Sequence, residues 1–160
     1  MTASYHDIKG KSVLVTGGAS GIGASIVRAF CAQGARVGFF DIDDAAAEKL
    51  YAEIERDLDV RPHYMSLDLR DQAGIPKAVT EMASKIGVID VLVNNAARDD
   101  RHSPEETGPD EWREKLDVNL SHQFFCSRAV AKGMAEKGRG SIINFSSVSY
   151  MMGLPDLVTY

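Results

Sequence analysis

The sequence has few cysteines and no long apolar run. Its two cysteines, Cys31 and Cys126, stand in helix-like apolar patterns, so we expect buried, reduced thiols and no disulfide framework. No apolar run approaches the roughly 18 residues that a membrane span needs, and the first residues lack the apolar core of a signal peptide. We therefore expect a cytoplasmic protein without a membrane partner.

A basic run is also absent. The 23 acidic residues outnumber the 18 basic ones and give a net charge of −5, so we do not expect nucleic acid as a partner. The four histidines are scattered without the spacing of metal ligands, and we predict no metal site. The composition itself, 44% hydrophobic and 26% charged, excludes a disordered or fibrous chain.

Short apolar runs alternate with helix-like apolar stripes along all 160 residues. This alternation predicts an α/β fold: a doubly wound, Rossmann-like parallel sheet in three αβα layers, forming one domain over residues 1–160. The predicted strands are 12–16, 37–40, 63–67, 89–93 and 141–145. The predicted helices are 22–34, 47–58, 75–86 and a long segment marked by Trp112, Leu116, Leu120 and Phe124.

Polar and glycine clusters follow the predicted strands. They are 16–23, Asp41, Asp68, 94–97 and 146–147. Since parallel sheets bind ligands at the carboxyl ends of their strands, these clusters predict one shared crevice.

The first cluster, TGGASGIG at 16–23, lies between a predicted strand and a predicted helix. In this context Gly17 permits a tight turn, Gly21 lets the backbone approach a pyrophosphate, and Gly23 allows the helix to pack closely on the strand. A glycine-rich turn with a packing role alone is the alternative. A nucleoside-triphosphate loop is excluded because no Lys-Ser or Lys-Thr pair follows the last glycine.

Asp41 ends the second predicted strand, 24 residues after Gly17. This offset is close to that of the acid that binds the adenosine ribose in dinucleotide sites. At about 5 Å and an effective dielectric of about 20, a carboxylate repels each unit of charge on a ribose 2′-phosphate by about 3 kcal/mol, which favours NAD over NADP by about a hundredfold. Asp41 could instead be a solvated strand-end acid, as we expect for Asp43 and Asp44 at the start of a helix.

Together with four further motifs, the glycine loop resembles the short-chain dehydrogenase/reductase family over all 160 residues. These motifs are Asp68-Leu69, NNAA at 94–97, Asn119 within DVNL, and Ser147 followed 13 residues later by Tyr160. The family usually has NNAG, and we expect the methyl group of Ala97 to cause only a local shift. The resemblance implies cofactor contacts from Gly17, Ser20, Gly21, Ile22, Gly23, Asp41, Asp68, Leu69, Asn95, Ala96 and Tyr160.

The resemblance also implies that Asn119, Ser147 and Tyr160 are catalytic. Tyr160 would take the proton of a substrate hydroxyl, Ser147 would hydrogen-bond the substrate oxygen, and Asn119 would hold a helix backbone and a water molecule in a proton relay. From the residues alone, they read as a helix-capping serine, a surface asparagine and a terminal tyrosine.

In the family, a lysine follows the tyrosine four residues later, and the last strands of the fold come after it. In this numbering, both would lie beyond Tyr160. We therefore expect the C-terminal part of the fold to be missing and the 160-residue chain to be inactive by itself. We expect the parent protein to be a dehydrogenase that forms a homodimer or homotetramer.

The segment NAARDDRH at 95–102 resembles the NAD-dependent aldose 1-dehydrogenases of the family, as does YMMGLPDL at 150–157. The resemblance implies that NAD oxidises the C1 hydroxyl of a sugar such as D-xylose, L-arabinose or D-galactose to the lactone. Selecting a polyol requires several directed hydrogen bonds, and the candidate substrate contacts are Arg98, His102, Ser147 and Asp156. A dehydrogenase for another secondary alcohol, such as a sugar alcohol or hydroxyacyl compound, and a non-catalytic nucleotide-binding protein are the alternatives.

Overall fold

The computed structural model describes residues 4–160 as a five-stranded sheet in which every neighbouring pair of strands is parallel, in the order β3-β2-β1-β4-β5. This confirms the predicted doubly wound α/β fold. The strands are β1 Ser12–Thr16, β2 Arg36–Asp41, β3 His63–Ser66, β4 Val91–Asn94 and β5 Ser141–Asn144. The helices are α1 Gly21–Ala32, α2 Asp44–Leu58, α3 Ile75–Ile86, α4 Pro109–Leu116, the π-helical turn η1 Asp117–Ser121, α5 His122–Glu136 and α6 Ser149–Met152.

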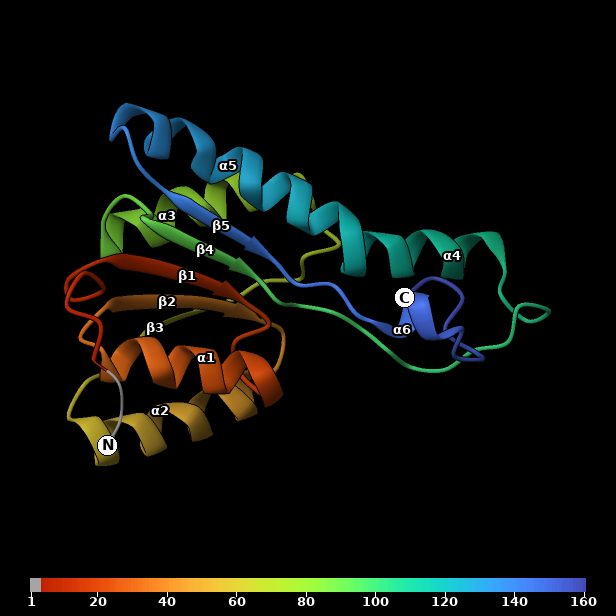
Figure 1. The fold of residues 1–160 in the computed structure, drawn as a ribbon, viewed down its shortest axis with the longest axis horizontal. Helices are drawn as coiled ribbons and strands as arrows, with labels where there is room; N and C mark the ends of the chain where they lie inside the picture. Colours follow the sequence, from red (N-terminus) through yellow and green to blue (C-terminus); the bar gives the residue numbers. More distant parts are fainter. Residues whose placement is uncertain (1–3) are drawn as a thin grey trace.

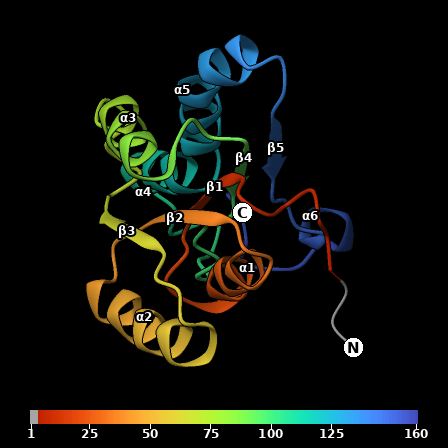
Figure 2. The ribbon, with the colours of Figure 1, turned by 90° about the vertical axis from the view of Figure 1, so that its left-hand side faces the viewer.

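Helices cover both faces of the sheet. Helices α1 and α2 lie on one face, and α3 and α5 lie on the other (Figures 1 and 2). Because side chains of a strand alternate between its faces, Val13 and Val15 pack with α1 and α2, whereas Leu14 packs with α3 and α5. All five residues of β1 are buried, which explains the apolar run Val13-Leu14-Val15 at its centre.

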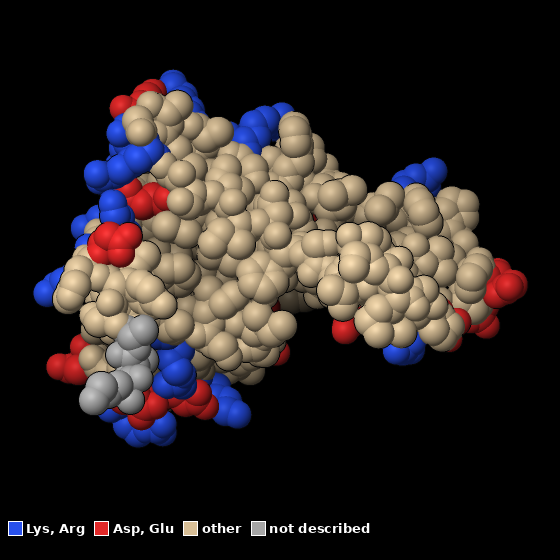
Figure 3. Space-filling view, in the orientation of Figure 1, with Lys and Arg blue, Asp and Glu red and all other residues tan. Residues whose placement is uncertain are grey.

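The carboxyl ends of the strands point toward a lobe that contains α4, α6 and the loop between β4 and α4 (Figure 1). Figure 3 shows the molecule narrowing between the body around the sheet and this lobe. The polar clusters of the sequence therefore face the lobe.

The long helical segment predicted near Trp112 is present as α4, η1 and α5, but its expected apolar stripe faces solvent. Trp112, Leu120 and Phe124 are 44%, 62% and 63% exposed. The buried side chains of α5 begin at His122, two positions after Leu120. Two residues correspond to about 200° around a helix, so the two rows lie on opposite sides.

Strand β5 is an edge of the sheet, and all four of its residues are exposed. Strand β4 begins at Val91, two residues later than predicted. Just before it, the Asp90 backbone still bonds to both neighbouring strands, since its N–H donates to the Ser12 carbonyl and its carbonyl accepts from the Ser141 N–H. The Asp90 carboxylate accepts a hydrogen bond from the Ser12 backbone N–H and pairs with Lys137.

Both cysteines, Cys31 and Cys126, are buried and free, as predicted. Burial raises the pKa of Cys31 to about 11 and that of Cys126 to about 12, so both are thiols at neutral pH. Within residues 4–160, no helix combines the length and the apolar character that crossing a membrane requires.

Candidate functional site

The glycine loop has the geometry that its sequence predicts. Gly17 has a φ of +65°, and a Cβ atom there would lie 2.8 Å from the Cα of Ala96. A Cβ at Gly23 would collide with the carbonyl oxygen of Gly17, so α1 packs against the loop as closely as its backbone allows. Ser20 makes no side-chain cap, and Ile22 is 65% exposed in the first turn of α1. Unpaired N–H groups of this helix start therefore face a site that suits an anion.

A cavity of about 250 Å³ lies beside the glycine loop. Ser20, Gly21 and Ala24 line one side, and Lys49 and Glu53 of α2 line the other. The site combines a helix N-terminus with a neighbouring hollow, which fits the phosphate-bearing part of a dinucleotide. Sequence reasoning did not single out Lys49.

Asp41 lies at the end of β2 and bonds to the glycine loop. One carboxylate oxygen accepts from the Ala19 N–H at 2.8 Å, and the other accepts from the Ile42 and Asp43 N–H groups at 2.8 and 3.1 Å. A carboxylate has about four acceptor positions, so it can also accept from a ribose hydroxyl. The neighbouring Asp43 caps α2 by accepting from the Ala46 N–H, as expected of a helix-start residue.

The end of β4 is joined to the end of β1. Asn95 donates through its side chain to the carbonyl oxygens of Thr16 and Gly17 at 3.1 and 3.0 Å. The Thr16 hydroxyl accepts from the backbone N–H groups of Asn95 and Ala96, which leaves its proton to be donated toward His122 Nε2, 3.4 Å away. Ala97 is exposed, so its methyl group does not crowd the strand end.

His122 is fully buried beneath this junction. Burial lowers the pKa of its imidazole to about 4. The side chain is therefore neutral at pH 7, when Nε2 can accept from Thr16. The sequence offered no sign of this role, because a histidine in the first turn of a helix is usually exposed.

Asp68 and Leu69, two of the predicted cofactor contacts, follow β3. The Asp68 carboxylate bonds the Arg70 guanidinium at distances down to 2.6 Å, which lowers the pKa of Asp68. Arg70 also pairs with Glu114 of α4 at 2.6 Å. The Leu69 side chain is 7% exposed and packs in the core, which leaves mainly its backbone to face a ligand.

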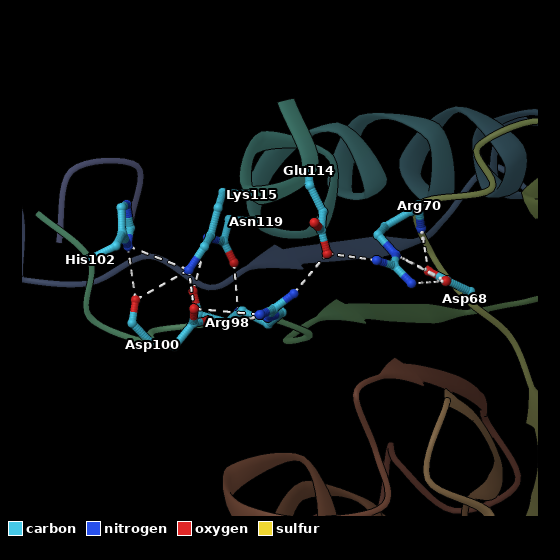
Figure 4. Close-up of polar contacts among 8 residues, drawn as sticks. All are labelled: Asp68, Arg70, Arg98, Asp100, His102, Glu114, Lys115 and Asn119. Atoms are coloured by element: carbon cyan, nitrogen blue, oxygen red, sulfur yellow. Dashed lines mark hydrogen bonds and ion pairs between the residues drawn. The ribbon is translucent and has the colours of Figure 1, made fainter. Parts of the chain in front are cut away.

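Asn119 lies in the π-helical turn η1 and clamps the polar loop after β4 (Figure 4). Its side-chain oxygen accepts from the Arg98 N–H at 2.7 Å, and its amide donates to the Arg98 carbonyl at 3.0 Å. The Arg98 side chain extends to Asp100 and Glu114. Asn119 therefore fixes a candidate substrate residue and occupies an irregular turn, a feature frequent at functional sites.

The last segment brings candidate residues next to the same loop. The His102 N–H donates to the Asp156 carbonyl at 2.9 Å, and His102 forms a parallel bridge with Leu157. Asp156 has a φ of +62°, an uncommon conformation for a residue with a side chain. Tyr160 is 39% exposed and ends this segment.

Ser147 accepts a hydrogen bond from the Ser149 N–H at 3.1 Å. It is not the helix cap that the residues alone suggested, because Val148 holds the N-cap position of α6. The hydroxyl proton of Ser147 is still available for a substrate oxygen. Within residues 4–160, no hydrogen bond joins the hydroxyls of Ser147 and Tyr160.

The described residues contain no group of three or more His, Cys, Asp or Glu side chains placed to hold a metal ion. The residues near the carboxyl ends of β1, β2 and β4 fit a dinucleotide better. They offer a helix start, an acid at the end of β2 and a polar loop.

Known proteins are similar to the chain over nearly its whole length. A family model described as short chain dehydrogenase matches residues 11–160. The chain is 43% identical over 159 residues to a Rhizobium meliloti (strain 1021) protein named probable galactose dehydrogenase, and 44% identical over 159 residues to a D-xylose 1-dehydrogenase of Caulobacter vibrioides. It is also 43% identical over 144 residues to a 3-alpha-(or 20-beta)-hydroxysteroid dehydrogenase of Mycobacterium tuberculosis.

A solved structure agrees with the fold. A Sinorhizobium meliloti 1021 protein, described as a putative short-chain alcohol dehydrogenase, superimposes with a TM-score of 0.88 at 30% identity, over 95% of this chain and 60% of that one. The two sugar dehydrogenases are matched over 99% of this chain but 62% of their own length, so the chain spans about three fifths of these relatives. The chain belongs to the short-chain dehydrogenase family.

Proposed function

We propose that the intact protein is an NAD-dependent oxidoreductase that oxidises the C1 hydroxyl of an aldose to a lactone. One observation carries the proposal: the polar loop of residues 98–102 contacts the segment that ends at Tyr160. The loop carries hydrogen-bonding groups of the kind that a polyol requires, and its contacts with Asp156, Leu157 and Thr159 support the proposal. The sugar dehydrogenases among the relatives support the same substrate class.

Asp41 supports NAD over NADP. Its carboxylate lies at the end of β2 and is fixed to the glycine loop by the Ala19 N–H. A ribose 2′-phosphate bound beside Asp41 would meet the negative charge of its carboxylate. Glu53 lines the neighbouring cavity together with Lys49, and its carboxylate pairs with Arg28 at 2.7 Å.

The residues of the chain have separate tasks in the proposed reaction. Oxidation removes a hydride from C1 and a proton from its hydroxyl, and a bound nicotinamide supplies the hydride acceptor. Tyr160, as the phenolate, accepts the hydroxyl proton, and Ser147 donates a hydrogen bond to the substrate oxygen. Asn119 holds the Arg98 backbone, and with it the loop that selects the sugar.

The test is NADH formation by the intact protein with D-galactose, D-xylose, L-arabinose, D-glucose, sorbitol and a hydroxysteroid. Tyr160→Phe removes the proposed base, and Tyr5→Phe makes the same change at an exposed tyrosine outside the site. We expect an aldose to react with wild type and Tyr5→Phe, and the rate to fall by about a hundredfold or more in Tyr160→Phe.

Two results would contradict the proposal. Oxidation of sorbitol or a hydroxysteroid with every aldose inert would establish the second candidate, a dehydrogenase for another secondary alcohol, which the hydroxysteroid relative favours. Binding of NADH without oxidation of any of these compounds would leave a nucleotide-binding role.

A further inference from the structure

Lys115 is a buried charge on a helix that is otherwise largely solvated. It is the buried residue of α4, and its side chain is 3% exposed. A buried ammonium group is unfavourable unless it is paired and hydrogen-bonded. Its position in the charged sequence EWREKLD gives no sign that it points inward.

The partners of Lys115 all belong to the polar loop of residues 98–102 (Figure 4). Its Nζ donates to the Asp100 carboxylate and to the Asp100 carbonyl at 3.3 Å, and it lies 3.4 Å from His102 Nδ1. The Asp100 carboxylate also accepts from Arg98, and these cations lower its pKa. The loop has no regular backbone pairing before His102, so its path depends on these side-chain contacts together with the two hydrogen bonds of Asn119 to the Arg98 backbone.

The same loop holds the segment that leads to Tyr160. Arg101 donates to the Pro155 carbonyl at 2.8 Å. His102 forms its bridge with Leu157, and its Nε2 lies 3.4 Å from the Thr159 hydroxyl. At one nitrogen, Nδ1, the His102 ring donates to the Asp100 carbonyl at 3.0 Å, beside Lys115. At the other it faces the residue directly before Tyr160.

We propose that Lys115 is a positioning residue that, through Asp100 and His102, holds the polar loop against residues 155–160 and so places Tyr160 beside the sugar. The inference rests on the proposed function. Lys115 need not touch the substrate, because its ammonium is enclosed by the loop. The Asp100 side chain is 49% exposed, so it can still accept from a sugar hydroxyl while it holds Lys115.

This arrangement separates the substrate side from the cofactor side. Among residues 4–160, Lys115 donates hydrogen bonds to Asp100 and lies against His102, whereas the glycine loop is held by Asp41 and Asn95. A charge pair that only stabilised the fold would affect both sides alike. A positioning role predicts damage to aldose binding and turnover with NADH binding intact.

The experiment compares Lys115→Met and Lys115→Arg in the intact protein. Lys132→Met is the matched control, because Lys132 is 87% exposed on α5. We expect Lys115→Met to raise the aldose KM and to lower kcat, each by about tenfold or more, without changing the NADH Kd. Lys115→Arg should recover part of the loss, and Lys132→Met should match wild type.

Hydrogen–deuterium exchange provides a readout that does not depend on activity. In Lys115→Met, exchange should rise in residues 98–103 and 154–160 while β1 and β2 stay protected. Unchanged exchange in 154–160 would overturn the positioning role, and so would unchanged kcat and KM in an active protein.

If wild type oxidises no aldose, the proposed function fails and the exchange data alone decide the positioning role. If Lys115→Met does not fold, the same measurements on Asp100→Asn decide it by the same criteria.

Discussion

His122 should make the stability of the protein fall between neutral and mildly acidic pH. Its imidazole is fully buried under the junction of β1 and β4, where it faces the Thr16 hydroxyl. Burial lowers its pKa from 6.5 to about 4. Protonation in the folded state would place a charge in the core.

The direction and size of this change in the free energy of unfolding follow from the linkage between proton binding and folding. The unfolded chain binds a proton at His122 as the pH falls through 6.5, whereas the folded protein does so only near pH 4. The free energy of unfolding therefore decreases as the pH falls from 6.5 to about 4. Above this window, the titration of His122 does not change the free energy of unfolding. A pKa difference of this size corresponds to a total loss of about 3 kcal/mol once the pH is below both values.

Urea unfolding of wild type and His122→Gln at a series of pH values measures the effect. Glutamine does not titrate, so the variant should lose stability less steeply between pH 6.5 and 4, even if it is less stable at pH 7. His6→Gln removes an exposed histidine and should keep the steep dependence of wild type. Parallel curves for wild type and His122→Gln would refute the reasoning, because carboxylates contribute equally to both.

Three further changes test the site. Asp41→Asn removes the proposed repulsion, so the ratio of kcat/KM with NADP to that with NAD should rise by up to about a hundredfold in coenzyme kinetics. Gly23→Ala should lower the free energy of unfolding in urea by about 1–3 kcal/mol and weaken NADH binding, because its Cβ meets the Gly17 carbonyl, whereas Gly108→Ala, in open space, should change stability by less than about 1 kcal/mol. Asn119→Ala loses both bonds to Arg98 and should lower kcat and increase hydrogen exchange in residues 98–103; unchanged values would argue against the clamp.

Local patterns predicted most of the fold because the sheet is buried on both faces over its central strands. The apolar run at 12–16 is strand β1 without change of bounds, and the stripes at 47–58 and 75–86 are helices α2 and α3. The spacing of apolar residues does not predict burial where such residues face solvent. Leu120 and Phe124 have helical spacing, but spacing does not say which side of α5 meets the sheet.

The glycine loop and Asp41 could be predicted because each role is set by a few neighbouring residues at a strand end. Lys115 and His122 could not, because their roles depend on long-range contacts. His122 meets Thr16 from 106 positions away. The sequence alone does not distinguish an exposed lysine on a charged helix from a buried lysine that pairs with a loop.

The charged side chains on and around α4 differ in how far they are exposed to solvent, and therefore in how much their ion pairs contribute to stability. Side chains of alternating sign run from Asp68 through Arg70, Glu114, Arg98 and Asp100 to Lys115 (Figure 4). The first five are 39–49% exposed, so salt screens their pairs and each contributes little to stability. The ammonium of Lys115 is shielded from solvent. Rising ionic strength should therefore weaken the link between Asp68 and the polar loop before it weakens the hold of Lys115 on that loop.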